Sequence, residues 1–124
     1  MQPIIDNIFS GFPSPATGEV FETIAGSDAV RIERIVSRGQ ATPEGQWLEQ
    51  EQDEWVLLLA GAAGILFEGD PETHGLVSGD YLLIPARCRH RVAWTAPDGD
   101  TVWLAVHFTA AHTLLTTGVP YLDR

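Results

Sequence analysis

The sequence predicts a single all-β domain, built as an antiparallel sandwich or barrel, and three observations lead to this prediction. The chain of 124 residues has room for one hydrophobic core. Its apolar residues gather in short segments rich in β-branched, aromatic and leucine side chains, which recur about every 8–12 residues with Gly, Pro and Asp turns between them. No long segment has helical periodicity, and we expect at most one helical turn, near residues 110–115.

Six segments are predicted to be strands. Residues 29–36 largely alternate apolar and polar side chains, as a strand with one buried face does. Residues 54–60 are almost continuously apolar, which is typical of a strand covered on both faces. The other predicted strands are 65–68, 81–85, 91–94 and 101–108, and turns are predicted at 61–64, 69–75 and 96–100. The single domain spans 1–124, with an arm over about 1–28, a core over about 29–109 and a tail over 110–124.

The charge balance excludes two classes of partner. The chain has 17 acidic and 7 basic residues, a net charge of −10, and every basic residue is arginine. Such a field repels phosphate backbones, so neither nucleic acid nor an anionic membrane is an expected partner. No apolar run approaches the roughly 20 residues that cross a bilayer. The lone Cys88 permits no intrachain disulfide and no secretory signal is visible, so we expect a cytoplasmic protein.

Residues 47–61 resemble the first motif of the cupin superfamily. In that motif two histidines, one residue apart, precede a glutamate by three or four residues, and a glycine follows farther on. Glu54 and Gly61 match the glutamate and the glycine. The histidine pair is absent: a four-residue spacing places Trp47 and Glu49 at its positions, and a three-residue spacing places Leu48 and Gln50 there.

Residues 79–90 resemble the second cupin motif. Gly79, Pro85 and His90 match its glycine, proline and histidine, whereas Arg87 stands where the motif usually has glycine. The resemblance implies a cupin-type antiparallel jelly-roll barrel of about six to eight strands, whose mouth often holds a divalent metal.

Two interpretations of the metal site follow from the resemblance. Glu49, Glu54, His90 and His107 form a carboxylate-rich candidate set for one divalent ion, either iron, manganese, zinc or nickel. In the other interpretation the barrel binds no metal, and Glu54 and His90 belong to a polar cluster in which Arg34 offers a further partner for the buried carboxylate.

Strand alternation predicts a mostly apolar pocket. It points Val56, Leu58 and Ala60 inward with Glu54, and Val92 and Trp94 inward with His90. We therefore place Trp94, Arg34 and the rim residue Trp47 at the pocket. Alternation also points Trp55, Leu57 and Leu59 outward, and this apolar face predicts a homodimer.

The predicted function is the binding of a small molecule in the barrel, without an assigned activity. The alternative is a metal-dependent enzyme, either an oxygenase or an isomerase or epimerase, acting on a small polar metabolite. A metal-free epimerase with His90 as base and Tyr81 as acid is a third arrangement. Whether the protein is an enzyme stays open at this stage, because the same barrel hosts unrelated chemistries.

Overall fold

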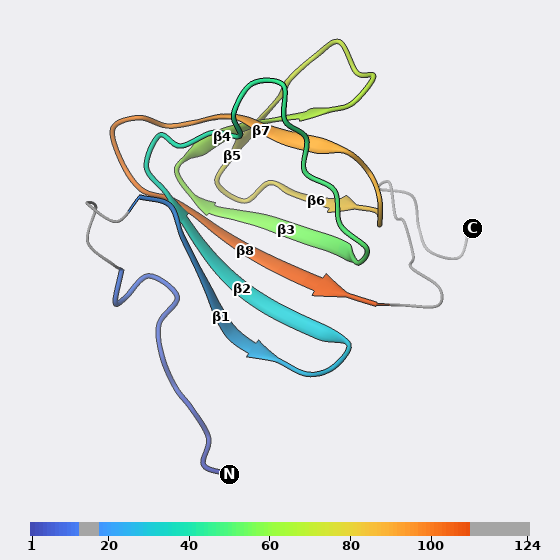
Figure 1. The fold of residues 1–124 in the computed structure, drawn as a ribbon. Helices are drawn as coiled ribbons and strands as arrows, with labels where there is room; N and C mark the ends of the chain where they lie inside the picture. Colours follow the sequence, from blue (N-terminus) through green and yellow to red (C-terminus); the bar gives the residue numbers. More distant parts are fainter. Residues whose placement is uncertain (13–17, 110–124) are drawn as a thin grey trace, which may run out of the picture.

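The regular structure of this chain is entirely β in a computed structural model that describes residues 1–12 and 18–109 (Figure 1). No helix among these residues is long and apolar enough to cross a membrane. The strands are β1 (Val20–Gly26), β2 (Val30–Ser37), β3 (Asp53–Ala60), β4 (Ala62–Phe67), β5 (His74–Val77), β6 (Tyr81–Ile84), β7 (His90–Thr95) and β8 (Thr101–Phe108).

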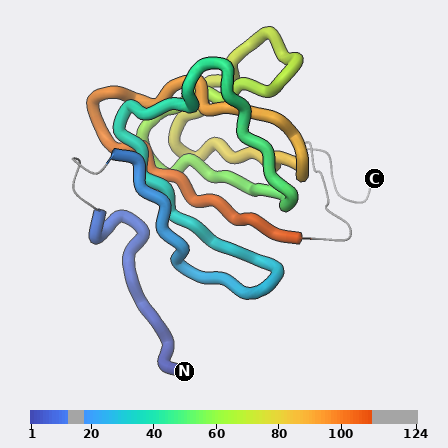
Figure 2. Tube along the Cα trace, in the orientation of Figure 1, coloured from blue at the N-terminus to red at the C-terminus, as the bar shows by residue number. Residues whose placement is uncertain are grey.

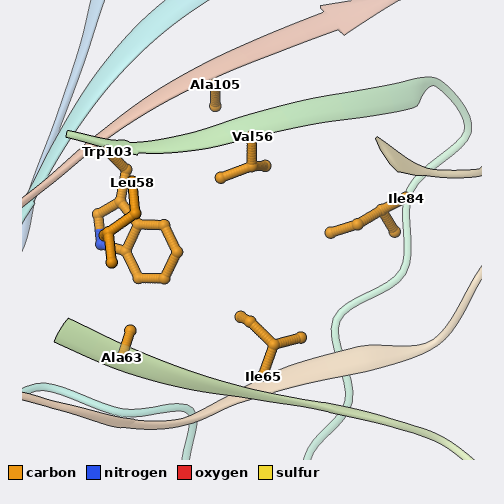
Figure 3. Packing of buried hydrophobic residues seen from close by; sticks show 7 residues of the cluster. All are labelled: Val56, Leu58, Ala63, Ile65, Ile84, Trp103 and Ala105. Atoms are coloured by element: carbon orange, nitrogen blue, oxygen red, sulfur yellow. The ribbon is translucent and has the colours of Figure 1, made fainter. Parts of the chain in front are cut away.

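Two antiparallel sheets face each other across the core. The large sheet has the order β1-β2-β8-β3-β6, and the small sheet has the order β5-β4-β7. Val56, Leu58 and Trp103 of the large sheet pack against Ala63 and Ile65 of the small one (Figure 3). The predicted antiparallel barrel is therefore confirmed.

The connection between β2 and β3 runs beside β7 and closes one wall of the barrel. Leu48 and His90 exchange two backbone hydrogen bonds, and the Thr42 amide donates to the Val92 carbonyl. This connection carries Gln50 to the inside of the barrel, where it meets Glu54. The start of the chain, by contrast, extends away from the barrel (Figure 2), and it meets the large sheet where Arg34 donates to the carbonyl oxygens of Ile8 and Ser10.

Two strands were missed, and a third begins earlier than predicted. β1 lies inside residues 1–28, where we predicted no strand, and β5 overlaps the predicted turn 69–75. Both are edge strands, and their largely exposed side chains lack the apolar signal of a buried strand. β4 includes most of the predicted turn 61–64, of which only Gly61, with φ of 89°, turns the chain. The helical turn expected near 110–115 lies outside the described residues.

A β-bulge in β7 overturns the predicted orientation of Trp94. Thr95 pairs with Ala63 and Trp94 with Gly64, but Ile65 pairs with Val92, so that β7 carries one extra residue, Ala93. The extra residue shifts the alternation, so Thr95 is buried whereas Trp94 is 43% exposed. A Cβ atom on Gly64 would lie 2.2 Å from the indole nitrogen of Trp94, so the glycine makes room for the indole.

Candidate functional site

The barrel encloses a cavity of about 520 Å³ between its two sheets. One part of its wall is apolar and includes Ile35, Val56, Ile65, Val92 and Trp103. The volume lies within the range of small-molecule sites, which are mostly apolar with a few polar groups placed together. The polar groups here lie where β3, β7 and β8 bring their charged residues close.

Glu54, His90 and His107, three of the four residues predicted as metal ligands, meet at the cavity. Glu54 and His107 are cross-strand partners on β3 and β8, and His90 is the first residue of β7. The Nε2 atom of His107 lies 3.7 Å from Oε2 of Glu54, and the Nε2 atom of His90 lies 3.9 Å from Oε1. The side chains are only 11% exposed for Glu54 and 6% for each histidine.

The backbone fixes the orientation of His90. Its Nδ1 atom lies 2.9 Å from the carbonyl oxygen of Cys88. Because a carbonyl oxygen can only accept, Nδ1 carries the proton, and in the neutral ring Nε2 is a free acceptor on the side of Glu54. The His90 ring thus presents a basic nitrogen to the cavity next to a buried carboxylate.

Glu33 on β2 also belongs to this cluster, and the sequence analysis missed it. Its Oε1 atom lies 3.4 Å from Nε2 of His107, whose Nδ1 atom is buried without a hydrogen-bond partner. The alternation over residues 29–36 predicts one buried face made of the apolar residues, which leaves Glu33 on the other face. Glu33 instead lines the cavity together with Ile35. The strand register explains this, because Glu33 pairs with Ala105 of β8, and Ala105 pairs with the cavity residue Val56 of β3.

The structure decides between the two spacings of the first motif. The amide of Gln50 donates to Glu54, and Leu48 pairs with His90. Leu48 and Gln50 therefore occupy the positions of the histidine pair, as the three-residue spacing predicts. Glu49 lies at the rim of the cavity, its side chain 48% exposed and 3.8 Å from the guanidinium of Arg89. Glu49 is thus separated from the cluster, and the half-buried Trp47 is not among the residues that line the cavity.

The residues as arranged do not fit a metal. Within 1–12 and 18–109, no group of three or more His, Cys, Asp or Glu side chains is placed to hold an ion. His90 and His107 approach different oxygens of Glu54, and the amide of Gln50 also occupies one of them. At the two positions of the histidine pair, Leu48 has no donor atom and Gln50 has only an amide.

Arg34 lies outside the cavity, contrary to the prediction. It sits on the opposite face of β2 from Glu33, pairs across the sheet with Leu104, and is 6% exposed. Its guanidinium binds the Glu22 carboxylate at 2.6 Å and donates to the carbonyl oxygens of Ile8 and Ser10. Arg34 therefore anchors the N-terminal segment to the large sheet.

The match to the second motif is supported by the backbone of Arg87. Its φ of 67° lies in the left-handed region, which glycine adopts most easily, and it is the only such non-glycine residue among those described. The Arg87 amide donates to the carbonyl oxygen of Gln50 at 2.7 Å, so this turn also positions the first-motif segment.

Comparisons with known proteins agree with this fold. No protein-family model and no curated protein matches the chain. A cupin superfamily protein from Desulfitobacterium hafniense DCB-2 is 26% identical, with a TM-score of 0.61 over 74% of this chain and 78% of its own. An RmlC-like cupin from Desulfovibrio desulfuricans shares the fold, with 18% identity and a TM-score of 0.66 over 86% of this chain and 97% of its own.

The chain belongs to the cupin superfamily. A further solved structure, a provisionally named mannose-6-phosphate isomerase from Ralstonia eutropha JMP134, is 47% identical to it. The TM-score is 0.83, and the match covers 87% of this chain and 100% of the Ralstonia protein.

Proposed function

We propose that this cupin binds a small organic molecule in the cavity between its two sheets. The observation that carries the proposal is the distribution of side chains around the cavity of about 520 Å³. Its apolar wall offers burial to a compact ligand body, and Glu54, His90 and His107 converge at its polar part. This arrangement orients a ligand that has one apolar side and one side with hydrogen-bond donors.

The cluster is proposed to work without a metal. The carboxylate oxygens of Glu54 lie 3.7 Å from Nε2 of His107 and 3.9 Å from Nε2 of His90, beyond direct hydrogen-bond distance. A hydroxyl or amine of a ligand can therefore donate to Glu54 or to the Nε2 atom of His90 without breaking a short internal bond. The amide of Gln50 holds one oxygen of Glu54 in place.

A second candidate function is proton transfer on a small carbonyl compound, as in an isomerase or epimerase. The fixed tautomer of His90 favours it, because a neutral Nε2 atom facing the cavity is placed to act as a general base. The provisional isomerase name of the Ralstonia protein supports the same class. Tyr81 is not the matching acid: it is 66% exposed and contacts the ring of Trp55, which lies on the outer face.

The homodimer stays a prediction. Trp55 and Leu57 lie on the outer face of the large sheet, where they pair with Val106 and Leu104 of β8 and with Leu83 and Tyr81 of β6. These neighbouring side chains on β8, β3 and β6 form an apolar surface that a second copy of the chain would cover.

Filling the cavity with a larger side chain tests the binding proposal. Val92→Trp places an indole in the cavity, and Val77→Trp is the matched control because Val77 is exposed and does not line it. A fragment library of neutral ring compounds is screened by NMR, with the indole N–H signal of the cavity residue Trp103 as the readout. We expect hits that shift this signal in the wild type and in Val77→Trp but not in Val92→Trp. Hits that bind Val92→Trp equally well, or no hits at all, would contradict the proposal.

A further inference from the structure

We infer that the cavity selects a positively charged ligand, such as a primary amine, over a phosphorylated one. The inference rests on the proposed binding function and adds the chemical class of the ligand. Four carboxylate side chains line the cavity, those of Glu19, Glu33, Glu49 and Glu54, whereas Arg31 is the one arginine among the lining residues.

Arg31 does not balance these carboxylates, although Arg89 lies 3.8 Å from Glu49 at the rim and the Ser37 hydroxyl donates to Glu19. The Nε atom of Arg31 lies 3.6 Å from Oε2 of Glu33, and about half of its side chain is exposed. Its charge is therefore shared with a neighbouring carboxylate and screened by solvent at the opening. An incoming phosphate that used this guanidinium would also meet the like charge of Glu33.

Glu54 lies deeper and has no arginine partner among the residues that the structure describes. Its hydrogen-bond donor is the neutral amide of Gln50, and the imidazole nitrogens of His90 and His107 lie at 3.9 and 3.7 Å. A buried carboxylate without a close cation has a strong preference for one, because the surroundings screen its charge poorly. An ammonium group supplies the cation, and its three N–H donors suit a site where the carboxylates of Glu54 and Glu33 both face His107.

The Nδ1 atom of His107 is the second sign that the cluster is incomplete. The ring is 94% buried and lines the cavity, yet Nδ1 has no hydrogen-bond partner while Nε2 faces two carboxylates. Buried polar atoms in folded proteins are normally paired. The charge balance of the cavity thus favours an amine and disfavours a sugar phosphate.

A matched series of three probes tests the inference. Benzylamine, benzyl alcohol and benzyl phosphate share one apolar ring and differ in charge, and their affinities are measured by calorimetry at low ionic strength. We expect benzylamine to bind about tenfold more tightly than benzyl alcohol, and benzyl phosphate to bind more weakly than both. Raising the salt concentration should narrow these differences.

Two variants and one control assign the selectivity to the cavity. Glu54→Gln and, separately, Glu33→Gln should reduce the preference for the amine to about threefold or less. Glu72→Gln changes the net charge equally in an exposed loop and should leave the preference unchanged. Equal binding of amine and alcohol, or a preference for the phosphate, overturns the charge selectivity but leaves the binding function standing. If none of the probes binds and the fragment screen also finds no hits, the binding function fails as well.

Discussion

The two halves of the barrel interior share the same strands but have opposite characters. β3 contributes Leu58 to the apolar half and Glu54 to the polar half, and β8 likewise contributes Trp103 and His107. Four residues along a strand separate the members of each pair, a distance of about 13 Å. In the apolar half the indole N–H of Trp103 donates to Ser37, which in turn donates to Glu19, whereas the polar half holds charges whose burial contributes little to stability. Stability and chemistry are thus placed in different halves and should respond separately to mutation.

The largest expected effect is a loss of stability in the apolar half. Leu58→Ala removes a fully buried side chain from the core between the sheets, and we expect the free energy of unfolding to fall by about 3 kcal/mol. Denaturant titration measures this change. The half-buried neighbour Leu59 is the matched control, and Leu59→Ala should cost clearly less. A loss below about 1 kcal/mol for Leu58→Ala would show that stability does not reside in this half.

The second prediction concerns the polar half. Glu54→Gln keeps the shape of the side chain and its contact with Gln50 but removes the buried charge. We expect the free energy of unfolding to change by less than about 1 kcal/mol, because the charge has no close cation to lose. Denaturant titration of this variant beside Leu58→Ala tests the separation directly. A loss as large as that of Leu58→Ala would mean that the carboxylate supports the fold.

The smallest effect on stability is expected outside both halves of the interior, in the loop between β4 and β5. The backbone N–H of Glu72 and, next, the side chain of His74 hydrogen-bond to Asp70 and lower its pKa below the ordinary 3.8. Since the folded pKa is the lower one, the ionised carboxylate stabilises the loop above the unfolded pKa, and this contribution is lost as the pH falls through the folded pKa.

An NMR titration of the Asp70 carboxyl carbon tests this prediction. His74→Ala should raise the Asp70 pKa only part of the way toward the ordinary 3.8, because the hydrogen bond from the backbone N–H of Glu72 remains. A pKa at the ordinary value in the wild-type protein would contradict it. Global stability should barely change in this variant, in contrast to Leu58→Ala.

The sequence predicts the long central strands well, because residues 54–60 and 101–108 have strong apolar patterns and many partners. It also predicts that Glu54, His90 and His107 lie close together, and the structure places all three at the cavity. It fails for the edge strands β1 and β5, whose exposed side chains follow no strong pattern.

The remaining errors in the candidate site have local physical causes. Glu33 was missed because β2 has a second apolar face, on the outside of the large sheet. Arg34 was misplaced for the same reason, and Trp94 because a bulge cannot be recognised from alternation.

The bulge at Ala93 also bears on how such a barrel could evolve. β7 has one residue more than its partner strand, and because Ala93 is accommodated as a bulge, Thr95 faces inward and the indole of Trp94 outward. Loss of Ala93 would remove the bulge, and simple alternation from His90 would still place Thr95 inside and that indole outside. The bulge thus lets β7 carry the length of one extra codon without turning the indole into the space where a ligand could bind.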